Sequence, residues 1–298
     1  MKQHLINVYI FLIFTSGSIF SQVTSEQIHY GASSLSMAAS DIAIPKTSWS
    51  AFVNAAGIVD QQGVTFVASS QSHFSQDFLS HSLFGVQFKN SKYGSFGISF
   101  ENSSVDYSGN NLAAETAIGI HQGISLRSDR NSSFSFGYGL KSYTVDYGSS
   151  AGPSGDGSDG IELGSLNAFG LDVSFLGSLG KRIKVGAKAL NINSPTLGNA
   201  NLATRLPQRS QIGLAYSPYD LVWTTAALNK SVGHPTNFSS GFSYEVQQNI
   251  FLRAGMQSNP NRFSSGLEFY FKKVSITYGF ITHPVLPLSH QLSIEVNR

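Results

Sequence analysis

Residues 132–141 read SSFSFGYGLK, and a similar rhythm returns in VSITYGF at 274–280 and LSIEV at 292–296. In each stretch an apolar side chain alternates with a small or polar one, so that every second residue belongs to the same face. We find no comparable stripe with a period of 3.6 residues after residue 60. A period of two predicts β-strands that have one apolar face and one polar face.

The alternation predicts a series of long strands along the mature chain. Most of them reach the ~9–11 residues that a tilted strand needs to cross a membrane, whereas strands of globular proteins usually have about 5–6. The fourteen predicted strands lie near 62–70, 79–89, 93–102, 116–128, 132–147, 165–177, 182–193, 208–217, 220–230, 238–247, 249–257, 262–271, 273–281 and 290–297.

The connections between these strands alternate between short and long. The long ones include Ser103–Glu115, Gly148–Gly164 and Ser194–Pro207. Outer-membrane barrels have short periplasmic turns and longer outer loops. We therefore expect an all-β protein, a transmembrane antiparallel β-barrel of about 14 strands with an N-terminal hatch segment in the lumen. A soluble or secreted β-protein is the alternative.

Composition excludes several other classes of protein. Charged residues make up 12% of the chain, against roughly 25% in soluble domains, and Cys is absent. A disulfide scaffold, a zinc–thiolate site and a cysteine nucleophile are therefore excluded. No Lys/Arg-rich run suggests a nucleic-acid partner. No later segment approaches 18 apolar residues, so a membrane-spanning chain would have to close into a barrel.

The N-terminus has the layout of a cleavable signal peptide. Lys2 precedes an apolar stretch, Leu5–Phe14, which is followed by small residues up to Ser21. We expect cleavage after Ser21, with an uncleaved anchor as the alternative. The expected division is then a signal peptide at 1–21, a hatch or plug at 22–61 and the barrel at 62–298. The expected location is the outer membrane of a Gram-negative cell, in contact with its lipids.

The polar face of the strands would line the interior of the barrel. A barrel of this size lies between the filled eight-stranded type and the open porins, so its lumen is wide. Besides Gly, Ser and Thr, the expected inward-facing residues are Glu101, Lys141, Asp172, Lys184, Lys188, Glu245, Arg253, Glu268 and Glu295.

Residues 22–61 do not alternate as spanning strands do. They contain GASSLSMA at 31–38 and WSAFVNAAGI at 49–58, which are small and apolar. Such a segment needs a dry environment, and the barrel lumen provides one.

These two blocks resemble the N-terminal hatch of the PorV/PorQ-like branch of the FadL-type outer-membrane β-barrel family of Bacteroidetes. The resemblance implies a fourteen-stranded barrel and a hatch that acts in ligand binding or gating. Two positions depart from the family pattern, because Ala55 replaces a Pro and Ala38 replaces a Gly. Asn54 either forms a turn or acts directly in transport. The hatch residues that the resemblance implies are Gly31, Leu35, Met37, Trp49, Asn54, Ala55, Ala56 and Gly57.

The resemblance implies two functions. The preferred one is a non-enzymatic component, or cargo-handling partner, of a type IX-like protein secretion system, whose long loops would bind secreted cargo or other subunits. The alternative is a FadL-like channel for the uptake of hydrophobic small molecules. We expect no catalytic residue, metal site or cofactor, because no nucleophile motif is present and the eight His are scattered. His121 with a nearby Ser would be the starting point for a barrel hydrolase.

Overall fold

The computed structural model describes most of the chain from residue 29 onward. None of its described helices is long and apolar enough to cross a membrane. The predicted signal peptide, residues 1–21, lies outside the described residues. These are residues 29–44, 47–90, 93–107, 110–150, 152–155, 158–198 and 203–298.

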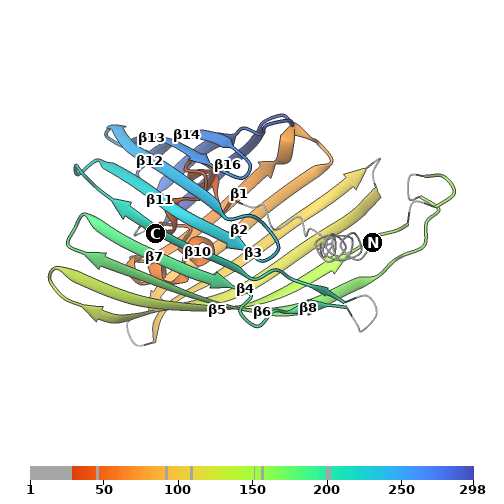
Figure 1. Ribbon diagram of the computed structural model, residues 1–298, viewed down its shortest axis with the longest axis horizontal. Helices are drawn as coiled ribbons and strands as arrows, with labels where there is room; N and C mark the ends of the chain where they lie inside the picture. The colour runs from red at the N-terminus through yellow and green to blue at the C-terminus, as the bar shows by residue number, and fades with distance from the viewer. Residues whose placement is uncertain are drawn as a thin grey trace, which may run out of the picture.

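Fourteen strands close into one antiparallel barrel, in which each strand pairs with two neighbours and β16 completes the ring by pairing with β1 (Figure 1). The predicted all-β barrel of about 14 strands is therefore confirmed. The barrel strands are β1 (Val64–Ser72), β2 (Leu79–Asn90), β3 (Gly94–Tyr107), β4 (Asn110–Ser128), β5 (Ser132–Asp146), β6 (Ser165–Leu179), β7 (Ile183–Leu190), β10 (Arg209–Tyr216), β11 (Val222–Ser231), β12 (Asn237–Gln247), β13 (Ile250–Gln257), β14 (Arg262–Phe271), β15 (Val274–Ile281) and β16 (Ser289–Asn297).

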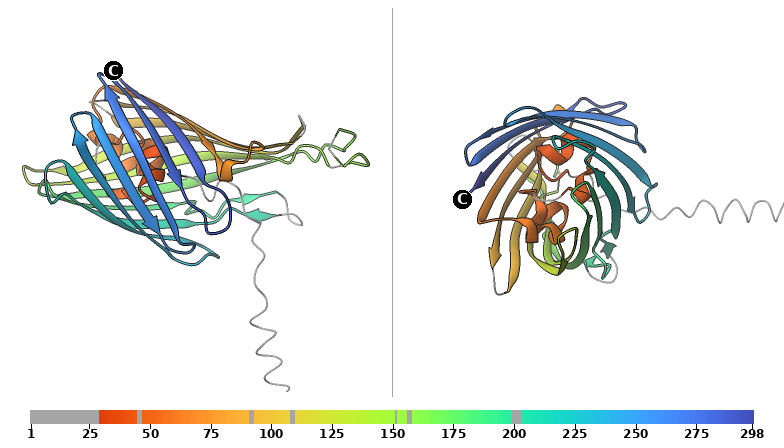
Figure 2. Two further views of the ribbon diagram at one scale, coloured as in Figure 1. Left: turned by 90° about the horizontal axis from the view of Figure 1, so that it is seen from above. Right: turned by 90° about the vertical axis from the view of Figure 1, so that its left-hand side faces the viewer.

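The remaining elements are short. A hairpin of β8 (Thr196–Leu197) and β9 (Thr204–Arg205) lies in the connection between β7 and β10. One 3-10 helix, η4, follows β1, and the other helices precede the barrel and lie inside the ring of strands (Figure 2). The helices are α2 (Ala32–Ser36), η2 (Asp41–Ala43), α3 (Ser50–Val53), η3 (Ala55–Asp60) and η4 (His73–Ser75).

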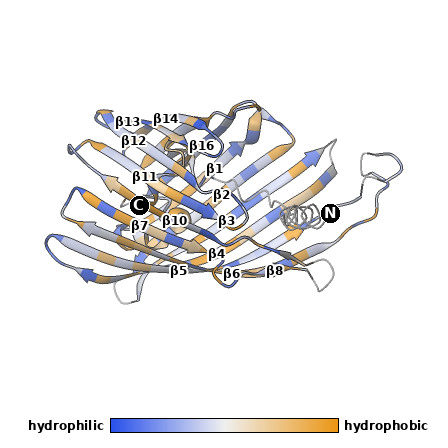
Figure 3. Ribbon diagram, in the orientation of Figure 1, coloured by the Kyte–Doolittle hydropathy of each residue, from blue (hydrophilic) through white to orange (hydrophobic). Residues whose placement is uncertain are grey.

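The two faces of each strand meet different surroundings. On β16 the inward-facing Gln291, Ser293 and Glu295 are 1–3% exposed, whereas the outward-facing Leu292 and Ile294 are 48% and 44% exposed. Apolar and polar residues alternate along the other strands as well (Figure 3). An apolar exterior around a polar interior is the arrangement that hydrocarbon imposes on a transmembrane barrel.

One predicted loop is wrong. The stretch 103–115 is not a loop, because β3 and β4 continue through it and pair Val105 with Ala113. These strands and their neighbours β5 and β6 extend beyond the rim of the barrel (Figure 2). Outside the hydrocarbon a strand needs no apolar face, so this part of the hairpin lacks the alternation on which the prediction relied.

The described parts of the connection between β7 and β10, residues 191–198 and 203–208, contact the inner wall. Leu197 and Leu206 are buried in one cluster with Val145 of β5 and Ala168 of β6. This cluster lies toward the end of the barrel that carries the long loops, which we call the loop end. The opposite end holds the short turns and the C-terminus and is called the turn end.

We expect a charge on the outer face to destabilise the barrel. Replacing Ile294 by Arg places a guanidinium in hydrocarbon, at a cost of about 2–4 kcal/mol near the bilayer centre. Denaturant titration of the protein in lipid vesicles measures this loss of unfolding free energy. Val285→Arg is the matched control, because Val285 is 86% exposed in the loop between β15 and β16. Equal stability of the two variants would contradict a lipid-facing outer wall.

Candidate functional site

The N-terminal segment, residues 29–61 without 45 and 46, packs against the inner wall of the barrel. Its large apolar side chains Leu35, Met37, Ile42 and Trp49 are at most 1% exposed. Its helices contact the wall on several sides, with α2 against β13–β16, η2 against β7, β10 and β11, and η3 against β2–β6. The main apolar core of the protein is therefore the contact between this segment and the wall.

The two blocks of the sequence motif meet at Gly31 and Trp49. Gly31 has φ +87°, and a Cβ there would lie 2.5 Å from Cε2 of Trp49. Only glycine tolerates both the backbone conformation and this contact. The indole N–H of Trp49 donates to Oε1 of Glu295 at 2.8 Å, which ties the segment to β16. Gly31 thus packs against the indole ring of Trp49, and Trp49 anchors the segment to the wall.

Asn54 connects three parts of the structure. Its amide nitrogen donates to the carbonyl oxygens of Ile42 and Phe175, each at 3.0 Å. Its amide oxygen accepts from the backbone N–H of Ala56 at 3.1 Å and so caps η3. With φ −159° the residue is extended, so it acts through its side chain rather than by adopting a turn conformation.

The other predicted hatch residues have packing roles. Ala55 begins η3 in the position of the expected Pro, Ala56 N–H also contacts Oγ of Ser174, and a Cβ on Gly57 would lie 3.0 Å from Oγ of Ser50. Leu35 and Met37 are buried. None of the eight predicted residues lines the cavity of about 380 Å³ that is described next. Their assignment to ligand binding or gating remains a prediction.

A cavity of about 380 Å³ lies between the N-terminal segment and the loop end of β7 and β10–β14. The segment contributes its floor through His29, Tyr30 and Asp41. The wall and rim are rich in polar and cationic residues, including Lys188, Arg209, Gln211, Asn237, Gln257 and Arg262.

Of the wall residues named above, the sequence analysis predicted only Lys188 to face the interior of the barrel. Arg209 and Arg262 begin β10 and β14, and their place on the cavity follows from the strand register rather than from a local pattern.

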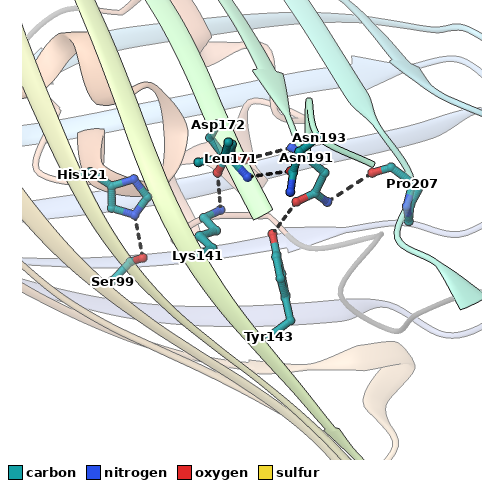
Figure 4. Close-up of polar contacts among 9 residues, drawn as sticks. All are labelled: Ser99, His121, Lys141, Tyr143, Leu171, Asp172, Asn191, Asn193 and Pro207. Atoms are coloured by element: carbon teal, nitrogen blue, oxygen red, sulfur yellow. Dashed lines mark hydrogen bonds and ion pairs between the residues drawn. The ribbon is translucent and has the colours of Figure 1, made fainter. Parts of the chain in front are cut away.

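Charged groups gather around Tyr30. The Nζ atoms of Lys188 and Lys141 lie 5.1 and 5.9 Å from the centre of its ring. Lys141 pairs with Asp172 at 3.2 Å, and Asp172 accepts from the backbone N–H of Asn191 at 2.9 Å (Figure 4). Lys141 thus has a carboxylate partner as well as the aromatic ring.

Burial shifts the pKa values of the residues on the cavity floor. Desolvation raises the pKa of Asp41, whose Oδ1 accepts from Oγ of Ser34 at 2.8 Å. Desolvation and the nearby Arg262 lower the pKa of His29 to about 3, so its imidazole is neutral near neutral pH. Burial also raises the pKa of the Tyr30 phenol.

His121 does contact a serine. Its Nε2 lies 2.8 Å from Oγ of Ser99 (Figure 4). Within the described residues, no carboxylate contacts its other ring nitrogen, so the orienting group of a hydrolase triad is missing there. His121 is 2% exposed.

We expect Asn54→Asp to loosen the segment while leaving the barrel closed. Aspartate keeps the acceptor that caps η3, but it cannot donate to the two carbonyl oxygens. Each buried group left without a partner costs about 1–3 kcal/mol, so amide exchange over residues 49–60 rises at least about tenfold. Mass spectrometry measures this exchange. Asn193→Asp is the control, because its amide also donates to a β6 carbonyl, that of Phe169, but in an exposed position. An unchanged exchange rate in Asn54→Asp would contradict the anchoring role.

Asp41 makes docking of the segment pH-dependent. A carboxyl whose pKa is raised on folding stabilises the fold below its unfolded value of 3.8, and this contribution disappears as the pH rises through the folded value. Asp41→Asn keeps an acceptor for Ser34 but carries no charge. We expect its thermal stability near neutral pH to exceed that of the wild type and to vary less from acid to neutral pH. Asp77→Asn, in an exposed loop, should retain the wild-type profile.

No family model matches the sequence, and no curated protein matches it either. Solved structures do match over nearly the whole chain. A mutant of the monoaromatic hydrocarbon channel TodX superposes with a TM-score of 0.66 at 13% identity, over 90% of this chain and 99% of that chain.

Two further channels have the same architecture. The toluene transporter TbuX of Ralstonia pickettii gives a TM-score of 0.62 at 9% identity, over 92% of this chain and all 100% of that one. A FadL homologue from Pseudomonas aeruginosa gives 0.56 at 12% identity, over 90% and 98%. This chain therefore has the fold of FadL-type outer-membrane channels, which supports the predicted outer-membrane localisation.

Proposed function

We propose that this protein is an outer-membrane channel for the uptake of small organic molecules, with the N-terminal segment as its hatch. The cavity of about 380 Å³ at the loop end carries this proposal, because the segment forms its floor. A molecule that enters from the loop side reaches the cavity first, and the segment then blocks its path to the turn end.

The comparisons favour this alternative over the secretion component that the sequence first suggested. Solved structures with this fold include a monoaromatic hydrocarbon channel and a toluene transporter. A position in the PorV/PorQ branch, with secreted cargo as partner, remains a hypothesis from the sequence motif alone.

The contacts of the segment suit a hatch. It is held by dispersed single hydrogen bonds, such as Ala32 N–H to Oγ of Ser293 at 2.7 Å and Ser40 Oγ to Thr225 Oγ1 at 2.6 Å. Each such bond contributes about 0.5–1.5 kcal/mol, so displacing one part of the segment breaks a few of them together with the apolar contacts of that part.

A disulfide between segment and wall tests the gating. The side-chain oxygens of Ser40 and Thr225 touch, so Ser40→Cys with Thr225→Cys should form a disulfide in this cysteine-free chain. We expect the wild type to increase uptake of radiolabelled toluene and benzoate by Gram-negative cells that lack their own FadL-type channels. The oxidised double variant should lose this uptake, and reduction should restore it.

The control links two wall strands instead. Oγ of Ser80 lies 2.7 Å from Oγ of Ser104, so a disulfide at these positions joins β2 to β3 and leaves the segment untouched. Its uptake should equal that of the wild type. Undiminished uptake by the oxidised Ser40–Thr225 pair would overturn the hatch, and no uptake of either compound by any variant would overturn the channel.

A further inference from the structure

Two cationic side chains face the same cavity from adjacent strands. The register of β7 and β10 sets Gln211 opposite Lys188 and Arg209 opposite Leu190. These four residues alternate with outward-facing ones such as Ala189 and Ser210, so they belong to the inner face. Lys188 and Arg209 therefore sit diagonally across neighbouring strands, within ~7–8 Å at the backbone.

These two cations differ from other inward-facing ones. Lys141 pairs with Asp172, and Arg253 pairs with Glu268. Within the part of the chain that the structure describes, the side chains of Lys188 and Arg209 form no ion pair and no hydrogen bond. The Nζ atom of Lys188 lies 5.1 Å from the centre of the Tyr30 ring. A partly buried cation without an anion is costly, so the cavity favours a negatively charged occupant.

The other charged groups on the cavity do not reverse this balance. Lys230 and Arg262 add two further cations at the rim. Asp41 is the carboxylate on the floor, and burial raises its pKa. His29 is neutral, and His234 lies on the exposed rim.

Several polar atoms of the lining also lack a partner. Within the described residues, Nδ1 of His29, Oγ of Ser231 and Oδ1 of Asn237 are buried without a hydrogen bond. Buried polar atoms are normally hydrogen-bonded, so their position on the cavity indicates a polar occupant. Apolar contacts are available beside them from Val53, Leu190 and other residues.

We propose that this cavity binds a compact organic anion, whose oxyanion group lies between Lys188 and Arg209 while its apolar body rests on the neighbouring lining. This inference rests on the proposed uptake function and specifies its substrate class. The occupant is small, since the cavity holds about 380 Å³. Neutral hydrocarbons of the same size bind more weakly, because they leave both cations without a counter-charge.

Calorimetry on the full chain purified in detergent tests the charge preference. Benzoate and benzamide have nearly the same shape, but only benzoate is an anion near neutral pH. We expect benzoate to bind at least about tenfold more tightly, a difference of about 1.4 kcal/mol. Inorganic phosphate in a third titration shows whether an oxyanion suffices without an apolar body.

The variants remove one positive charge at a time. Lys188→Met and Arg209→Met should each weaken benzoate binding at least about tenfold and leave benzamide binding unchanged. Lys184→Met is the matched control, because Lys184 is on the same face of β7 near the turn end and donates to the carbonyl of Gly180. It should bind benzoate as the wild type does. The faster migration of the folded barrel on unheated gels verifies that each variant is folded. If only one of Lys188→Met and Arg209→Met folds, that variant alone is enough for the test.

Equal binding of benzoate and benzamide, or unchanged benzoate binding in a folded Lys188→Met or Arg209→Met variant, would overturn the anion site. Binding is measured without transport, so the two proposals can fail separately. Benzoate binding without uptake leaves the anion site standing and rejects the channel. Toluene uptake without preferential benzoate binding leaves the channel standing and rejects the anion site.

Discussion

The absence of hydrogen-bond partners in hydrocarbon is the constraint on which the rest of this structure depends. Each backbone N–H and C=O of the membrane-spanning region has to pair within the protein, and the pairing of β1 with β16 closes the ring so that no edge is left. The same lipid requires one apolar face on every strand. The other face is then turned inward, where residues such as Lys141 and Glu295 need partners of their own.

Closing fourteen strands creates a lumen that wall side chains alone cannot fill. The N-terminal segment fills part of it, and small wall residues allow it to approach. A Cβ on Gly186 of β7 would lie 2.4 Å from the carbonyl oxygen of Ile42, so glycine is required for this contact. The segment does not fill the loop end, and the cavity there takes its chemistry from whichever wall residues remain uncovered. Those residues include Lys188 and Arg209.

The sequence predicted the strands well where lipid acts on them and less well elsewhere. The stretch 132–141 alternates because its outer face meets hydrocarbon, and it lies within β5. Residues 103–115 lie where no lipid requires an apolar face, so the hairpin there was mistaken for a loop. The motif residues Gly31 and Trp49 were recognised, but their contact with each other was not, because eighteen positions separate them along the chain.

Period-two alternation was enough to predict a barrel with an apolar exterior and a polar interior, because this alternation is a local property that lipid selects directly. Which interior charges neutralise one another could not be predicted in this way and follows from the folded barrel. Lys141 meets Asp172 because β5 and β6 are neighbours in a given register, and Lys188 and Arg209 share a cavity because β7 pairs with β10 across an eighteen-residue connection. Charge pairing depends on distances across the lumen, and those distances exist only once the ring has closed.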